Sequence, residues 1–133
     1  MHCILFQPVL KGGRFQGQGH LLHRAPIDSD VYVCCTVEDQ KTADERLSVF
    51  SSLPIKHKGI TAQPLVGPLS IEKYLDNIDL VTVGGESDTN GRIMDYSWVL
   101  DIREQCIRTN TSFSFRQCST NFVKDGKLYH LNI

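Results

Sequence analysis

Four residues near the middle of the chain combine a glycine pair with side chains that can bind polar ligands. Gly84 and Gly85 are followed by Glu86 and Ser87, directly after the apolar run 78–83. Branched apolar side chains predict a buried strand there, and the glycines let the backbone turn without a Cβ penalty. Since α/β sheets place ligand sites at strand carboxyl ends, Glu86 could bind an ammonium, a ribose hydroxyl or a sulfonium-bearing amino acid. The alternative is a strand exit without ligand.

Polar side chains also occur where three other predicted strands end. Parallel strands bring their carboxyl ends to one edge, so four such strands would gather these groups on one rim, as at a barrel mouth. Two alternatives stay open. Glu38 and Asp39 could be solvated residues ahead of a helix, and Arg116 could be an unpaired surface arginine instead of a carboxylate clamp. The candidate ligand-binding residues are Glu38, Asp39, Gln63, Gly84, Gly85, Glu86, Ser87, Arg116 and Gln117; catalytic residues are not identified.

Strands and helices alternate along the chain between residue 31 and the C-terminus. Besides 78–83, apolar or alternating runs predict strands, and capping residues with helical apolar spacing predict the helices. Thr42 and Glu45 form a capping-box pattern, Ser70 and Asp95 suit N-caps, and Asp125-Gly126 predicts a two-residue hairpin. The predicted strands are 31–37, 59–65, 78–83 and 112–117, and the predicted helices are 42–52, 70–75 and 95–108. This order predicts an α/β fold with a mainly parallel sheet, right-handed β-α-β crossovers and a C-terminal β-hairpin.

The chain divides into two unequal parts. Residues 31–133 form the predicted α/β domain, whereas 1–30 form an irregular N-terminal segment with one candidate strand at 3–6. The stretch 11–20 holds four glycines and no hydrophobic period, which predicts a loop.

Composition excludes several functional classes. The 133 residues are 41% hydrophobic and carry a formal net charge of -1, so no basic field favours nucleic acid or an anionic membrane. No apolar run reaches the roughly 20 residues that span a bilayer, and a signal peptide is not indicated. The five cysteines have no disulfide-scaffold spacing, which favours reduced thiols and a cytoplasmic location. No histidine or cysteine pattern is specific enough to predict a metal site.

Six stretches carry a family resemblance. They are VCCTVEDQKTADERL, SLPIKHKGI, QPLVGPLSIEKYL, VTVGGES, DYSWVLDIREQC and SFSFRQ. In this order and spacing they resemble the C-terminal half of a phage-associated bacterial family of unknown function. Longer members of that family resemble radical S-adenosylmethionine barrels. The resemblance implies half of a (β/α) barrel and makes S-adenosylmethionine a possible ligand.

The chain also departs from that family. Full-length relatives carry an N-terminal three-cysteine segment of the type that holds an iron–sulfur cluster, and no C-x3-C-x2-C pattern occurs here. Relatives commonly have glutamate where Gln63 stands and glycine where Asp88 stands. Because a cluster needs converging thiolates, we expect no cofactor in the isolated chain, which looks like a truncated member.

Two functional hypotheses follow. The first is a phage-related domain without independent catalysis, serving as a truncated or interaction module and self-associating as a homo-oligomer. The second is the ligand-binding half of a radical S-adenosylmethionine-like enzyme, completed by a separate cluster-bearing chain. Whether the chain is an enzyme stays open, and membrane and nucleic-acid partners are not expected.

Overall fold

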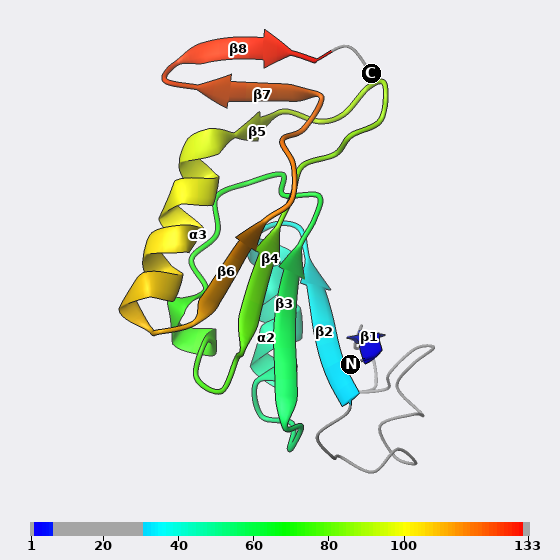
Figure 1. The fold of residues 1–133 in the computed structure, drawn as a ribbon, viewed down its shortest axis with the longest axis vertical. Coiled ribbons are helices and arrows are strands. Elements are labelled where there is room, and N and C mark those ends of the chain that lie inside the picture. Colours follow the sequence, from blue (N-terminus) through cyan, green and yellow to red (C-terminus); the bar gives the residue numbers. More distant parts are fainter. Residues whose placement is uncertain (1, 7–30, 132–133) are drawn as a thin grey trace.

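The computed structural model describes residues 2–6 and 31–131 of the chain. In this part, one sheet has the strand order β1-β2-β3-β4-β6 and a second has the order β5-β7-β8 (Figure 1). Every pairing in the five-stranded sheet is parallel, and β7 pairs antiparallel with β8. The elements are β1 (His2–Phe6), β2 (Val31–Val37), α2 (Gln40–Phe50), β3 (His57–Ala62), the 3-10 helix η1 (Glu72–Tyr74), β4 (Leu80–Val83), β5 (Met94–Asp95), α3 (Tyr96–Arg108), β6 (Ser112–Phe115), β7 (Asn121–Lys124) and β8 (Lys127–His130).

The predicted α/β class, parallel sheet and hairpin are therefore confirmed. Strand β1 lies where the sequence has its candidate strand, and it pairs with β2. The predicted loop at 11–20 lies outside the described residues. Strand β5 was not predicted: its two residues pair with β7, whose position is decided by the tertiary fold.

The four central strands end in one register. Val37 pairs with Ala62, Ala62 with Val83, and Val83 with Phe115. Because side chains alternate between the two faces of a strand, these residues and those two positions before them point to the same face. That face packs against both helices in a single hydrophobic core. Its buried members include Val33, Cys35, Val37, Ile60, Ala62, Val81 and Val83 from the strands, Ala43, Leu47 and Phe50 from α2, and Val99, Ile102 and Cys106 from α3.

The opposite face of the sheet carries a row of polar residues near the carboxyl ends of its strands. Thr36 pairs with Thr61, Thr61 with Thr82, and Thr82 with Ser114, which makes a row of four hydroxyl side chains. The three threonines are half-buried and Ser114 is exposed. We call this row the hydroxyl row.

The adjacent cysteines of β2 confirm the alternation between faces. Cys35 belongs to the helix-covered core, whereas Cys34 is buried outside that core. Burial raises the pKa of the Cys35 thiol to about 12, so this group stays protonated at neutral pH.

Helix boundaries differ in part from the prediction. Helix α2 begins two residues earlier than predicted, because Asp39 is its N-cap and accepts a hydrogen bond from the Thr42 amide (2.9 Å). Thr42 is thus the third helical residue, and the capping box is formed with Asp39 instead of Glu45. The prediction that Ser70 caps a helix is wrong, since η1 has Ile71 at its N-cap without a side-chain bond.

The later predicted ends agree more closely with the structure. Asp95 caps α3 by accepting from the Ser97 amide, and Asn110 leaves the helix with a left-handed φ of 56°. Asp125 and Gly126 both have positive φ (53° and 77°), as a two-residue hairpin turn requires. Near the end of α3, Cys106 is buried in the core, whereas the next residue, Ile107, is 56% exposed.

Lys58 is a buried cation on the core face of β3. Its side chain is 2% exposed, and Nζ donates to the carbonyl oxygens of Ser51 (3.0 Å), Leu53 (3.2 Å) and Phe50 (3.4 Å). These carbonyls lie at and just beyond the C-terminal end of α2, where a positive charge stabilises the helix dipole. Burial nevertheless lowers the pKa of Lys58. The interaction joins α2 to β3, two elements that are consecutive along the chain.

We predict that Lys58→Ala lowers the free energy of unfolding by about 2–3 kcal/mol, because buried carbonyls lose their donor. Lys58→Met should recover part of this loss by restoring the apolar stem. Urea unfolding followed by circular dichroism measures both. The control is Lys56→Ala, an exposed lysine two residues earlier, which should change stability by less than about 0.5 kcal/mol. Equal stability of the Lys58→Ala and Lys56→Ala proteins would contradict this role.

Candidate functional site

The parallel register places the predicted site residues at one edge of the sheet. Glu38, Gln63, Gly84 and Arg116 each follow the last paired residue of β2, β3, β4 and β6. The ladder continues into this position, since the Gly84 amide donates to Ala62 (3.0 Å) and the Arg116 amide to Val83 (2.8 Å). We call these four residues the carboxyl-edge row. Side-chain alternation puts this row on the same face as the hydroxyl row.

A loop of residues 84–93, the edge loop, follows β4 at this edge. Gly84 and Gly85 are required because other residues lie close to their Cα atoms. Neither has a positive φ; among the described glycines, only Gly126 has one. A Cβ on Gly84 would lie 2.9 Å from Cδ of Gln63, and a Cβ on Gly85 would overlap the backbone of Ser119. The sequence interpretation of these glycines as turn formers is therefore incomplete: the Gln63 side chain and residue 119 occupy the space.

Glu86 is bound within the edge loop itself. Its carboxylate accepts a hydrogen bond from the Arg92 amide (2.7 Å) and two more from the Arg92 guanidinium (both 3.1 Å). These bonds lower the pKa of Glu86, and those from the guanidinium have the largest effect. The carboxyl group is therefore ionised at neutral pH. The hydrogen bonds and charge of Glu86 in turn raise the pKa of Arg92, and the charges of Glu38 and Asp88 act in the same direction. Among the described residues, Arg92 forms its ion pair with Glu86 (3.1 Å).

The segment after β6 holds the edge loop in place. The buried Ser119 hydroxyl contacts the carbonyl oxygens of Glu86 (3.0 Å) and Arg92 (2.5 Å). The Thr120 hydroxyl donates to the Asp88 carbonyl (2.6 Å), and the Asn121 amide group donates to the Gly91 carbonyl (2.7 Å). These bonds bridge 27–33 residues of sequence and connect the edge loop to the start of β7.

The other predicted residues have mixed roles. Asp39 caps α2, and the Thr42 amide lowers the pKa of its carboxyl. Gln117 joins β6 to the edge loop, because its carbonyl accepts from the Gly85 amide (2.9 Å) and its side chain donates to the Gly85 carbonyl (3.3 Å). Arg116 and Ser87 are exposed.

The carboxyl edge is therefore a polar surface with an internal charge pair. A ligand at Glu86 must share this carboxylate with Arg92, whereas the exposed Arg116 guanidinium can still form paired hydrogen bonds with a carboxylate. Among residues 2–6 and 31–131, no group of three or more His, Cys, Asp or Glu residues could hold a metal ion. The helices in this same part of the chain are all too short or too polar to cross a membrane.

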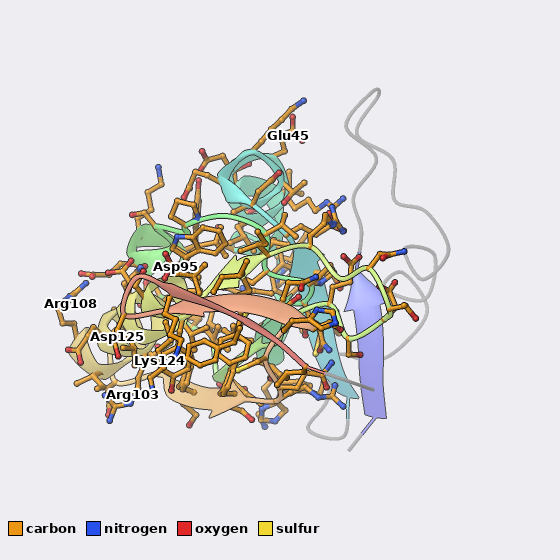
Figure 2. The ribbon with its side chains drawn as sticks, turned by 90° about the horizontal axis from the view of Figure 1, so that it is seen from above. Glu45, Asp95, Arg103, Arg108, Lys124 and Asp125 are labelled. Carbon is orange, nitrogen blue, oxygen red and sulfur yellow. The ribbon has the colours of Figure 1, made fainter. Side chains whose placement is uncertain are left out.

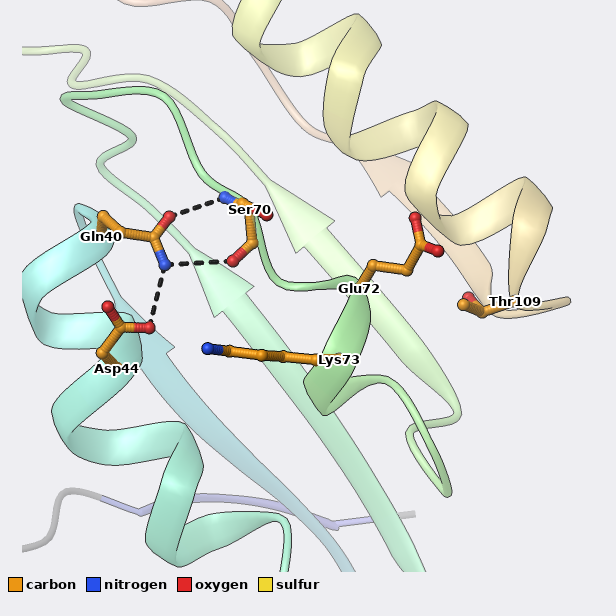
Figure 3. Close-up of a pocket in the computed structure, with 6 residues that line it drawn as sticks. All are labelled: Gln40, Asp44, Ser70, Glu72, Lys73 and Thr109. Atoms are coloured by element: carbon orange, nitrogen blue, oxygen red, sulfur yellow. Dashed lines mark hydrogen bonds between the residues drawn. The ribbon is translucent and has the colours of Figure 1, made fainter.

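A separate depression lies on the helical side of the sheet, between α2, η1 and the end of α3 (Figure 3). It has a volume of about 640 Å³, and three of its lining residues, Gln40, Asp44 and Ser70, pair with one another. Gln40 donates to Asp44 (3.0 Å) and to the Ser70 carbonyl (3.0 Å), and it accepts from the Ser70 amide (2.7 Å). These bonds hold α2 against the segment before η1.

The comparisons with known proteins decide the family. A model of the family "Protein of unknown function (DUF5131)" matches residues 7–128. The chain belongs to this family. No curated protein and no solved structure matches the chain significantly. Membership in DUF5131 assigns no activity, so the function of this DUF5131 chain has to be inferred from its geometry.

Sequence reasoning identified the ends of β2 and β4, placed those of β3 and β6 two or three residues too late, and missed the residues that organise this edge. Arg92, Ser119 and Thr120 lie in polar loops without a regular period, so nothing local indicates their partners. One signal was available: Gly91 stands immediately before Arg92, and a Cβ there would overlap the Glu86 carbonyl. A glycine beside a charged residue in a loop can mark such a close approach.

We predict that Arg92→Ala opens the edge loop. Hydrogen exchange at the amides of residues 91–92 should accelerate several-fold, because the carboxylate of Glu86 loses its guanidinium partner. The control is Arg103→Ala, an exposed arginine whose nearest carboxylate is the adjacent Glu104 (3.5 Å). The difference in exchange between the Arg92→Ala and wild-type proteins should be largest above pH 4.5, the ordinary pKa of a glutamate carboxyl. It should disappear as the pH falls through the lower pKa that Glu86 has in the folded protein, because the carboxyl then becomes protonated. Unchanged exchange at neutral pH would contradict the loop-closing role.

Proposed function

We propose that this chain is a phage-related α/β module without catalysis of its own, and that it acts by joining another chain or a second copy. Two rows of mostly polar residues on one face of the sheet support this. The hydroxyl row and the carboxyl-edge row occupy the face opposite the helix-covered core. In a (β/α) barrel, the helices lie outside and the corresponding strand face lines the interior.

The end of the sheet supports the same proposal. Strand β6 has β4 as its only strand neighbour in the described part of the chain. An unpaired edge favours association with a further strand, and a barrel removes such edges by closure. The layer order of the sheet and its helices supports our proposal that the domain is half of a barrel with right-handed crossovers. Completion of the sheet would cover Ser112 and Ser114 on β6, which are both exposed.

We predict that the isolated chain associates with itself in a concentration-dependent manner, and that Ser114→Lys weakens this association at least about fivefold. A lysine on an edge strand opposes strand addition. Ser114 is exposed, so its replacement should leave folding intact. Sedimentation velocity over a concentration series provides the measurement.

The matched control is Thr89→Lys, which adds the same charge at an exposed position of the edge loop. It should associate like the wild type. A monomer at all concentrations, both alone and with a co-encoded chain that carries three closely spaced cysteines, would contradict the proposed joining role.

A second candidate function is favoured by the carboxyl-edge row. In this proposal the chain is the ligand-binding half of a radical S-adenosylmethionine-like enzyme. The described residues do not fit an iron–sulfur cluster, since none of their groups could hold a metal, so the cluster belongs to the other chain. Arg116 would bind the carboxylate of the ligand's amino acid part, and the acidic residues Glu38 and Glu86 would attract its ammonium and sulfonium charges.

We predict that S-adenosylmethionine binds to the complex of this chain with the cysteine-bearing chain, and that Arg116→Ala weakens binding about tenfold. This factor corresponds to the loss of a charge-assisted pair of hydrogen bonds. Calorimetric titration of the anaerobic complex measures the dissociation constant. Arg103→Ala on the outer side of α3 is the control. Equal affinity of the Arg116→Ala and wild-type complexes would exclude the carboxyl-edge row as the ligand site.

A further inference from the structure

We propose that a second site, formed by the β7–β8 hairpin, binds a small planar aromatic ligand that carries a negative group. The site is a pocket of about 410 Å³ between the start of α3, the end of β6 and the hairpin. In Figure 1 the hairpin lies above the carboxyl ends of the sheet strands, next to α3. We call it the aromatic pocket. It is lined by Tyr96, Phe115, Cys118, Phe122, Lys124 and Tyr129.

Aromatic rings form two walls of this pocket. Tyr96 and Phe115 meet edge-to-face, with centroids 5.9 Å apart and an interplanar angle of 72°. Phe122 and Tyr129 are stacked, with centroids 5.1 Å apart and an angle of 13°. Flat walls of this kind favour a planar ring over a bulky aliphatic group, because stacking and edge contacts add to area burial.

Two of these four rings, those of Tyr96 and Phe115, pack against the hydrophobic core, whereas those of Phe122 and Tyr129 are not part of it. None of the four rings is fully buried, and Tyr129 is 38% exposed. The cost of leaving apolar ring surface in contact with water is recovered when a ligand covers it. The volume lies within the range of about 300–1,000 Å³ found for small-molecule sites.

Lys124 supplies the charge that selects an anion. Its ammonium lies 5.6 Å from the Tyr96 ring centroid, and none of the ion pairs among the described residues involves it. The nearby Asp95 carboxylate is occupied, since it accepts from the amide and the hydroxyl of Ser97. Seen from above, Lys124 and Asp125 lie at the turn of the hairpin, on the side of α3 (Figure 2). The ammonium is therefore available to a carboxylate or phosphate group of a stacked ligand.

A small molecule explains the pocket better than a nucleic-acid strand does. Strand binding needs a positively charged groove that follows the backbone as well as stacking rings. Here the chain has a net charge of -1, and the pocket has a single cationic side chain. One ring and one anionic group match the chemistry of its walls.

The experiment titrates the full chain with two anionic probes, indole-3-acetate for a carboxylate and adenosine 5′-monophosphate for a phosphate. Indole and adenosine are the corresponding neutral analogues. Calorimetry should show binding of at least one anionic probe, stronger than its neutral analogue by about fivefold or more. The anionic probe that binds more tightly distinguishes a carboxylate from a phosphate ligand. Lys124→Met should remove the preference for the anion, and Tyr129→Ala should weaken both forms.

Matched controls come from the same hairpin. Lys127→Met removes a lysine that contacts the Tyr129 ring (5.3 Å) but does not line the pocket, and Leu128→Ala changes a residue that is 58% exposed. Both should bind like the wild type. Cys118 gives a second readout: the bound ligand should slow its modification by a maleimide, with the modified peptide identified by mass spectrometry.

Three results would overturn the proposal. They are no binding of any probe at millimolar concentration, equal affinity in the Lys124→Met protein, and salt-dependent binding of single-stranded DNA in place of the small probes. These results would leave the proposed self-association and the proposed binding of S-adenosylmethionine at Arg116 unaffected.

Discussion

The common register of four parallel strands is the constraint on which the rest of the structure depends. The paired residues Val37, Ala62, Val83 and Phe115 end at one level, so the next residue of each strand belongs to one row. A slip of one residue in any strand would exchange its core and polar faces. The same register that buries Val83 therefore places Gln63 against Gly84 and aligns the hydroxyls on the opposite face.

The carboxyl edge is organised by contacts between segments that are distant in sequence. Glu86 and Arg92 close the edge loop, and Ser119 and Thr120 bind it from the segment after β6. This arrangement gives Glu86 a structural role, whichever ligand binds near it. It also explains the glycines at 84, 85 and 91, since each has another residue where its Cβ would stand.

The two proposed sites differ in chemistry and in position. The carboxyl-edge row and the hydroxyl row present polar groups on the open face of the sheet, where a second chain would close around them. The aromatic pocket instead combines stacked rings with one cation, and it lies between α3 and the hairpin. The proposed joining surface on the sheet and the proposed ligand site at the hairpin therefore share no residue.

Local patterns were sufficient to predict most of the secondary structure. The apolar run 31–37 is a strand with those same bounds, Asp95 caps α3, and the Asp125-Gly126 turn forms the hairpin. These features succeed because side-chain periodicity, capping and φ preference act over a few residues. Helix α2 begins early for a related reason: Asp39 and Thr42 both suit a cap, and only the bonds formed distinguish them.

The amino-acid sequence by itself determined the α/β class, the ends of β2 and β4, and the residue types available near the strand ends. Only the tertiary structure decided that Arg92 neutralises Glu86, that Lys58 binds the end of α2, and that β5 joins β7. Each of these pairs forms once the folded chain brings the partners together, and their spacing carries no period. The same holds for the aromatic pocket, because its rings come from α3, β6 and two strands of the hairpin, and their alignment is set by packing and not by local preference.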